Sequence, residues 1–107
     1  MAWSFSFLNS EVRAELDGLP LDMRASFERI VRLVHTVGLE RVHEPYIKHI
    51  EGRLWEMRLR GREGIARSLY VTASGGRVVI LRTFVKKTQK TPRREIELAQ
   101  RRAKEVT

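Results

Sequence analysis

The sequence predicts one α+β domain that spans residues 1–107, with N-terminal helices packed on an antiparallel β-sheet and a further helix at the C-terminal end. Apolar residues first recur at intervals of three and four, which is typical of helices. From about residue 54 they alternate with polar residues, which is typical of strands, and helical spacing returns after residue 91. A chain of 107 residues holds one modest core, and no internal repeat or linker divides it.

The N-terminal segment predicts a short strand followed by two helices. Residues 3–7 alternate aromatic side chains with serines, and this period of two indicates a strand. Asn9 or Ser10 is a candidate N-cap for a short helix, which the Asp-Gly-Leu-Pro run at 17–20 ends. A longer helix is expected next, because its apolar residues form a single stripe: Met23, Phe27, Ile30, Val31 and Val34.

A glycine ends the long helix, and a sheet is expected after an irregular connection. Gly38 is the expected C-cap, and Pro45 makes residues 39–49 unsuited to regular structure. Three strands are then expected at residues 54–60, 65–72 and 77–86, joined by turns at 61–64 and 74–76. The two glycines of the second turn accept the positive φ of a tight hairpin, so the strands form an antiparallel meander. Thr91 and Pro92 are expected to cap and start the last helix.

Charge is unevenly distributed along the chain, whose formal net charge is +8. Residues 1–52 contain six Lys/Arg and eight Asp/Glu, whereas residues 53–107 contain fifteen and five. A strongly basic half is typical of a surface that faces a polyanion, and the alternative is a solvated cationic face that maintains solubility. The absence of cysteine fits a cytoplasmic protein, and neither a signal peptide nor a membrane-spanning run is expected.

Several kinds of catalytic site find no support in the sequence. His35, His43 and His49 do not have the spacing of a metal site, and no metal or cofactor is expected. Neither a cysteine nor a G-x-S-x-G motif is present, so nothing indicates a protease or esterase nucleophile. Gly75 and Gly76 lie between two expected strands and not before a helix, so they do not form a phosphate-binding loop.

Cationic residues of the expected sheet are the strongest candidates for a functional site. They are Arg58 and Arg60 on one strand, Arg67 on the next, and Lys86, Lys87 and Lys90 at and after the end of the last. In an antiparallel meander these segments can converge on one side of the sheet, where they would bind phosphates and stabilise a phosphorane-like transition state. The alternative is that these positions simply face solvent. Tyr46, Tyr70 and Trp55 are candidates for base stacking, although Trp55 alternates in phase with core positions.

Two parts of the sequence resemble the RelE/HigB toxin superfamily. Leu-Trp-Glu-Met-Arg-Leu-Arg at 54–60 and Gly-Ile-Ala-Arg-Ser-Leu-Tyr at 64–70 look like its paired strands. Leu-Arg-Thr-Phe-Val-Lys-Lys-Thr-Gln-Lys-Thr-Pro at 81–92, followed by Glu-Ile-Glu-Leu-Ala at 95–99, resembles the signature of its phage-derived Gp49-like, HigB-type branch. The resemblance covers roughly residues 45–106.

The resemblance implies a compact RelE fold, in which helices flank a curved antiparallel sheet. It also implies the toxin of a type II toxin–antitoxin system, a ribosome-dependent endoribonuclease (mRNA interferase) that inhibits translation. Such enzymes cleave mRNA in the ribosomal A site without a metal, with the RNA 2′-hydroxyl as nucleophile and a cyclic phosphate as product. The implied partner is a cognate helix-turn-helix, HigA-like antitoxin, so the protein would be a monomer or part of a toxin–antitoxin hetero-oligomer.

The resemblance also assigns residues. The matched positions near the scissile phosphate are Arg58 and Arg67 on the strands and Lys87 after the last strand. Glu56 is the candidate general base, and Lys90 is the candidate proton donor or leaving-group stabiliser, because the tyrosine or histidine that some relatives carry near the C-terminus is missing here. Further RNA contacts are expected from Arg60, Lys86, Arg82, Arg93 and Arg94.

Two other functions remain open from the sequence. A ParE-like toxin has the same fold but poisons DNA gyrase and leaves RNA intact, and the cations retained on the strands argue against it. A non-catalytic RNA- or ribosome-binding module would share the same charge distribution. It would be recognised by binding that weakens steeply with salt in the absence of cleavage.

Overall fold

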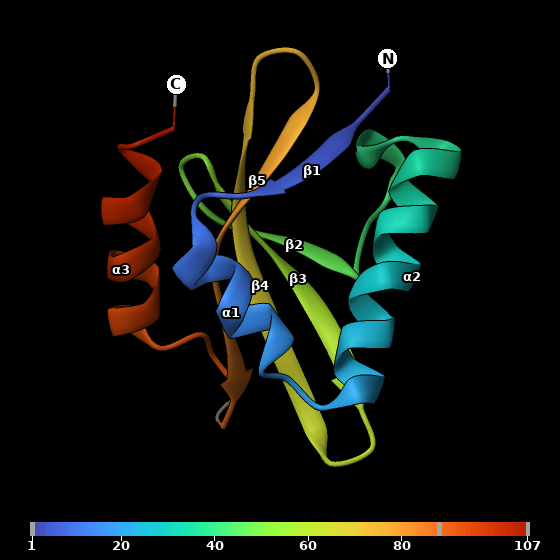
Figure 1. Cartoon of the computed structure of the whole chain (residues 1–107), viewed down its shortest axis with the longest axis vertical. Helices are drawn as coiled ribbons and strands as arrows, with labels where there is room; N and C mark the ends of the chain where they lie inside the picture. The colour runs from blue at the N-terminus through green and yellow to red at the C-terminus, as the bar shows by residue number, and fades with distance from the viewer. Residues whose placement is uncertain (1, 88, 107) are drawn as a thin grey trace.

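The computed structural model describes residues 2–87 and 89–106, and within them three α-helices flank a five-stranded sheet (Figure 1). The elements in chain order are β1 (Ser4–Phe7), α1 (Ser10–Asp17), α2 (Leu21–Val37), the 3₁₀-helix η1 (Leu39–Arg41), β2 (Ile47–Glu51), β3 (Leu54–Gly61), β4 (Gly64–Ala73), β5 (Arg77–Lys86) and α3 (Arg93–Ala103). The α+β fold class predicted from the sequence is confirmed.

The sheet has the strand order β1-β5-β4-β3-β2 and is mixed. The predicted antiparallel meander of β3, β4 and β5 is confirmed. The expectation of a wholly antiparallel sheet is wrong at one edge, because β1 pairs with β5 in parallel. The expectation that residues 39–49 are irregular is also wrong in part, because β2 begins at Ile47 and pairs antiparallel with β3. Only Ile47 of this strand is buried, so β2 lacks the alternating pattern that identifies the longer strands.

The predicted helix boundaries follow from local capping. The Asn9 side chain accepts a hydrogen bond of 3.0 Å from the backbone N–H of Val12, and α1 begins directly after Asn9, at Ser10. At the end of α2, Gly38 has a φ of +90°, a conformation that glycine adopts without the steric cost other residues bear. Thr91 departs from the prediction, because α3 begins after Pro92 without a side-chain cap.

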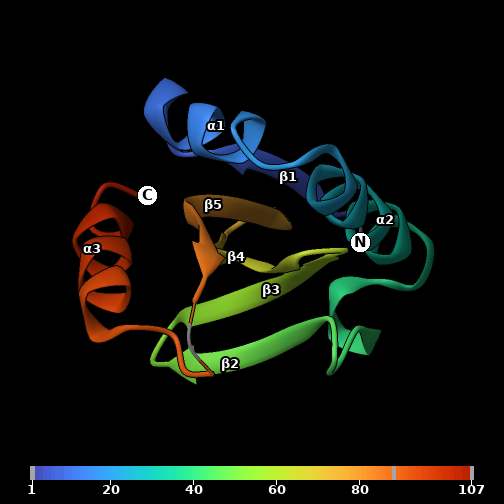
Figure 2. The ribbon, with the colours of Figure 1, turned by 90° about the horizontal axis from the view of Figure 1, so that it is seen from below.

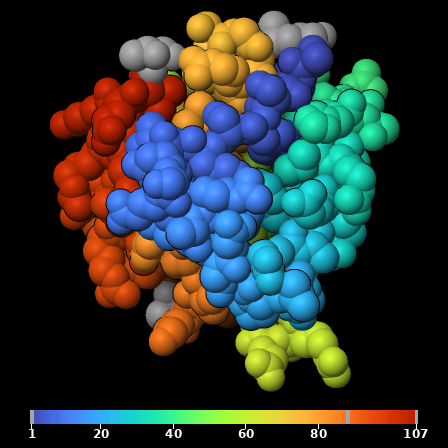
Figure 3. All heavy atoms as spheres, in the orientation of Figure 1, coloured from blue at the N-terminus to red at the C-terminus, as the bar shows by residue number. Residues whose placement is uncertain are grey.

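Two hairpins join the three long strands. Gly75 and Gly76 have φ values of +82° and +71°, so two of the three residues of the β4–β5 turn at 74–76 use the left-handed region that a tight hairpin requires. The β3–β4 hairpin turns at residues 62–63, with Gly61 paired to Gly64. Figure 3 shows this second hairpin projecting beyond the helices at the lower end of the molecule.

The sheet is covered on both faces, and Figure 2 shows α1 and α2 on one side and α3 toward the other. The helices α1 and α2 pack on a core that includes Val12, Phe27, Ile30, Met57, Leu59 and Tyr70. The helix α3 packs on a second, smaller core that includes Leu54, Leu69, Leu81, Phe84, Ile96 and Ala99. The helix α3 covers only part of this face of the sheet. Polar residues of β3 and β4 on the same face lie outside the core under α3. No described helix is long and apolar enough to cross a membrane.

Candidate nucleic-acid interface

Strand register brings together the cationic residues that the sequence distributes over four strands. Arg58 on β3 lies directly opposite Arg67 on β4, and Lys86 on β5 lies opposite Ile65, two residues from Arg67. On the other side, Lys48 of β2 lies opposite Glu56 of β3. Side chains of directly paired residues, and of residues two apart on one strand, share a face of the sheet. We call Lys48, Arg58, Arg67 and Lys86 the cationic cluster.

Glu56 lies at the centre of the cationic cluster and is fully buried. One of its carboxylate oxygens, Oε2, lies 2.9 Å from Arg67 Nη1 and 3.2 Å from Arg58 Nε. The other, Oε1, accepts hydrogen bonds from Arg67 Nη1 at 3.0 Å and from the Thr91 hydroxyl at 2.6 Å. A buried carboxylate is tolerated only with such partners, so Glu56 holds the two arginines and the segment before α3 in fixed positions.

Arg67 is also buried, with 4% of its surface exposed. Besides Glu56, its guanidinium donates to the Thr91 hydroxyl and, at 3.0 Å, to the backbone carbonyl of Gln89. Its buried Nε has no hydrogen-bond partner among the residues that the structure describes. The Thr91 side chain therefore bridges Arg67 and Glu56, which explains why it does not cap α3.

Lys86 experiences the combined charge of the cationic cluster. Burial, together with the nearby charges of Arg67 and Arg58, holds the pKa of the Lys86 ammonium below its ordinary value, and Lys48 adds to this effect while Glu56 opposes it. Arg58 is the more accessible of the two arginines, with 22% of its side chain exposed, and its Nη1 lies 3.8 Å from Glu44. Arg58 and Lys86 are therefore available to an anionic ligand, whereas the buried Arg67 contributes positive charge without being accessible.

Comparisons with known proteins identify the family. The sequence profile described as "Phage derived protein Gp49-like (DUF891)" matches residues 14–104. The chain belongs to this Gp49-like family. The resemblance to the phage-derived Gp49-like branch, stated from the sequence, is confirmed.

A solved structure shows the same fold as this Gp49-like chain. It is an alanine double mutant of the toxin RelE from E. coli in the free state, with a TM-score of 0.65 and 17% sequence identity. The match covers 95% of the Gp49-like chain and 98% of the RelE chain, so the RelE fold extends over nearly the whole molecule. Among curated proteins, no match was found.

The structure places the other predicted site residues of the Gp49-like chain in different surroundings. Arg60 is exposed on β3 toward the projecting hairpin. Lys87 and Lys90 are exposed and follow β5, whereas the neighbouring Lys86 lies on the strand and next to the arginines. Arg93 forms an ion pair of 2.7 Å with Glu51. The residues missing from the sequence-based prediction are Lys48 and Thr91, and strand β2, which carries Lys48, was not expected.

Two aromatic residues of the Gp49-like chain lie differently from the expectation. Tyr70 is 1% exposed, and burial raises the pKa of its hydroxyl, so it is not available for stacking on a base. Trp55 was expected in the core, but it is 39% exposed and its ring lies 4.9 Å from that of His49. Trp55 belongs to the inward-facing set of β3, but it lies near the start of the strand, where the helices no longer cover it.

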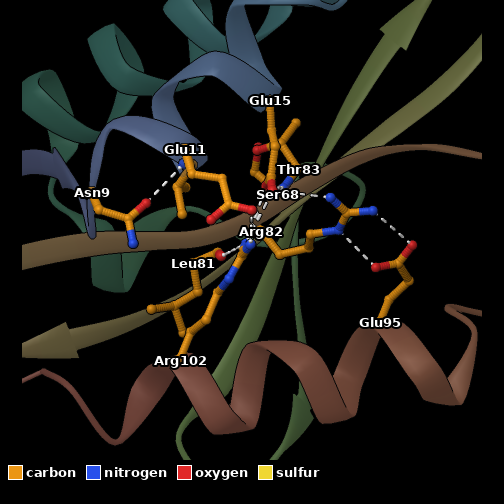
Figure 4. A network of polar contacts seen from close by, with 10 residues as sticks. Asn9, Glu11, Glu15, Ser68, Leu81, Arg82, Thr83, Glu95 and Arg102 are labelled. Carbon is orange, nitrogen blue, oxygen red and sulfur yellow. Dashed lines mark hydrogen bonds and ion pairs between the residues drawn. The ribbon is translucent and has the colours of Figure 1, made fainter.

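Arg82 of the Gp49-like chain does not belong to the cationic cluster, although the sequence suggested an RNA contact. Figure 4 shows its guanidinium between two carboxylates. Its Nη1 lies 3.0 Å from Glu15 Oε2, and its Nε lies 2.7 Å from Glu95 Oε1. Arg102 donates to Glu15 at 3.1 Å and to the backbone carbonyl of Leu81 at 2.7 Å. These contacts connect α1, β5 and α3, so we assign Arg82 a structural role in positioning α3.

Replacing Arg82 with methionine is expected to lower the free energy of unfolding by about 2 kcal/mol, because Glu95 is 7% exposed and would lose its charged partner. The measurement is urea denaturation followed by circular dichroism. Arg94→Met is the matched control, because Arg94 is an exposed arginine on α3, next to Glu95 in sequence. Its effect on the free energy of unfolding should stay within about 0.5 kcal/mol. Equal, small effects of both substitutions would contradict the structural role of Arg82.

Proposed function

We propose that this Gp49-like protein is the toxin of a type II toxin–antitoxin system and cleaves mRNA in the ribosomal A site, as the resemblance to RelE/HigB toxins implies. The observation that supports the proposal best is the cationic cluster around Glu56. Four cations surround one buried carboxylate on a sheet face that α3 covers only in part. Such an excess of positive charge suits a phosphodiester whose charge increases in the transition state.

In the proposed reaction, the 2′-hydroxyl of the RNA loses its proton to solvent water and its oxygen forms a bond to the adjacent phosphorus, while the bond from phosphorus to the 5′-oxygen breaks. The products carry a 2′,3′-cyclic phosphate and a 5′-hydroxyl group. Arg58 binds the non-bridging phosphate oxygens, for which a planar guanidinium with several N–H donors is well suited. Arg67 contributes its charge from its buried position beside Arg58.

Lys86 and Glu56 take different roles from those that the sequence suggested. We assign to Lys86, and not to Lys90, the protonation of the leaving 5′-oxygen, because its pKa is lowered by burial and by the arginines, which makes its ammonium a stronger acid. Glu56 was the candidate general base. Since both of its oxygens are occupied and its side chain is buried, we assign it the role of a positioning residue for Arg58 and Arg67.

The partners follow from the same proposal. The net charge of +8 suits binding to the ribosome and its mRNA, and also to an antitoxin that supplies acidic groups. A helix-turn-helix, HigA-like antitoxin would neutralise the toxin in a hetero-oligomer in the cytoplasm. No metal or cofactor takes part in the proposed reaction.

Induction of the protein without an antitoxin tests the proposal. We expect growth arrest and the cutting of translated transcripts, mapped by primer extension, with cyclic phosphate on the upstream fragments. Transcripts that are not translated should stay intact in the same cells. Intact mRNA together with DNA damage would contradict the proposal and indicate a gyrase poison, and RNA binding without cleavage on translating ribosomes would indicate a binding module.

A further inference from the structure

A cavity of about 570 Å³ lies between α2 and the outer end of β3, next to the cationic cluster. Its polar wall is formed by Ser26, Arg29 and Arg32 of α2 and by Arg58 and Arg60 of β3. Its apolar wall includes Ile30, Leu33, Pro45 and Tyr46. In Figure 1, α2 lies beside the lower part of β3, where this cavity is found. The volume is within the range of sites that bind small molecules.

The cavity exists because β2 is shorter than β3. Their pairing stops at Ile47 opposite Met57, and the next backbone N–H of β3, that of Arg58, donates to the Tyr46 carbonyl at 2.9 Å. Beyond this point α2 supplies the contact, since the Ser26 hydroxyl donates to the Arg60 carbonyl at 2.6 Å. The edge of β3 is thus joined to α2 by a side chain and not by another strand.

Of the four arginines around the cavity, Arg58 is paired with Glu56 and Glu44, and the other three have no carboxylate partner within the described residues. Among the described residues, no carboxylate lies within ion-pair distance of Arg29, Arg32 or Arg60. The guanidinium of Arg29 is oriented by a hydrogen bond of 2.9 Å from its Nη2 to the Ser26 hydroxyl. Arg82 and Arg102, by contrast, are paired with carboxylates in the network of Figure 4. The charge around the cavity is therefore available to an anion.

The cavity also offers a surface for a planar group. The side chain of Tyr46 is 48% exposed beside Pro45, and the buried Ile30 forms part of the wall. A nucleotide combines an anionic phosphate with a flat, weakly polar base, and aromatic stacking of a base together with contacts from arginine to phosphate is the usual way in which single strands are bound.

We propose that this cavity is a second nucleotide subsite, which binds the nucleotide next to the cleaved one in the same RNA strand. The inference rests on the proposed function. Its base stacks on Tyr46, and its phosphate binds Arg29 and Arg32. Arg58 connects the two sites, because it lines the cavity and also contacts Glu56 in the cationic cluster. This shared arginine favours RNA over an acidic peptide, since one strand with repeating phosphates would occupy both places.

Equilibrium binding of a short, fluorescein-labelled 2′-O-methyl oligoribonucleotide tests the subsite, because this probe is bound but not cleaved. Tyr46→Ala is expected to weaken binding about tenfold through the loss of stacking, whereas Tyr46→Phe keeps the ring and should bind as the wild type does. Arg29→Gln combined with Arg32→Gln should weaken binding at least as much. The slope of the logarithm of the binding constant against the logarithm of the salt concentration should also become shallower, by the equivalent of about one to two phosphate contacts.

The matched control is Arg41→Gln combined with Arg101→Gln, which removes the same charge from exposed positions outside the cavity. Three results would each overturn the subsite. They are an equal loss of oligoribonucleotide affinity in both double variants, no binding of the oligoribonucleotide by the wild-type protein, and variants that weaken the binding of a poly-glutamate peptide but not that of the oligoribonucleotide. Thermal melting verifies that each variant is folded. Cleavage on translating ribosomes is measured separately: a protein that binds RNA through this cavity but cleaves none retains the subsite and loses the proposed function.

Discussion

Replacement of Arg67 by alanine is expected to lower the free energy of unfolding by about 3–5 kcal/mol, a large part of the stability of a small domain. The reason is the carboxylate that remains. Glu56 is fully buried, and Arg67 is its closest charged partner, with an Nη1–Oε2 distance of 2.9 Å. Without Arg67, the contacts of this carboxylate that remain among the described residues are those with Arg58 and Thr91. Urea denaturation of the wild type and the variant measures the difference.

The double variant Arg67→Met with Glu56→Leu distinguishes the buried charge from lost packing. Replacing both members of a buried pair by apolar residues of similar volume is often nearly neutral, so most of the stability should return. The double variant should nevertheless be inactive toward RNA, because it lacks both the guanidinium beside Arg58 and the carboxylate that positions Arg58. If Arg67→Ala costs less than about 1 kcal/mol, the buried ion pair does not hold this part of the fold together.

Arg58→Ala and Lys86→Ala are expected to reduce the rate of mRNA cleavage on ribosomes by about 100-fold or more each, because Arg58 stabilises charge in the transition state and Lys86 acts as the general acid. Both side chains are partly exposed, and Glu56 keeps its contact with Arg67, so the folded structure should persist. The measurement is single-turnover cleavage on programmed ribosomes, together with thermal melting of each variant.

Lys87→Ala is the control for Lys86→Ala, because the two lysines are adjacent, but Lys86 is the last residue of β5 and experiences the charges of Arg58 and Arg67, whereas Lys87 follows the strand. We expect the Lys87 variant to retain most of the activity. Arg101→Ala removes one charge on the exposed side of α3 and should cleave as the wild type does. A larger loss from Lys87→Ala than from Lys86→Ala would show that the sequence-based choice of Lys87 was right and that the strand position does not matter.

The long elements were predictable because their patterns depend on neighbouring residues. The stripe of α2, the alternation in β3 and the paired glycines of the β4–β5 turn are all visible within a few residues of sequence. The pairing of β1 with β5 was not predictable, because a parallel contact at a sheet edge joins segments about 70 residues apart and leaves no local pattern in the sequence. The strand β2 was missed because Pro45 precedes it and only one of its residues is buried.

The site was predictable in its residue types and less so in its geometry. Arg58 and Arg67 were expected on one face, and the register places them opposite each other. Burial was not visible in the sequence: Glu56 has the alternation of a solvent-facing residue, yet it is fully enclosed because Arg67 and Thr91 cover it. The pairing of Arg82 with Glu15 and Glu95 likewise depends on how α1 and α3 dock on the sheet.

Cleavage of an mRNA that carries a single 2′-deoxynucleotide tests the central claim most directly. The modified residue is placed immediately upstream of the bond that the wild-type protein cuts in the ribosomal A site. If the cationic cluster acts on a phosphate attacked by its own 2′-oxygen, cleavage at this bond should disappear, while the same protein cuts the unmodified message. Cutting of both messages at the same rate would contradict the account.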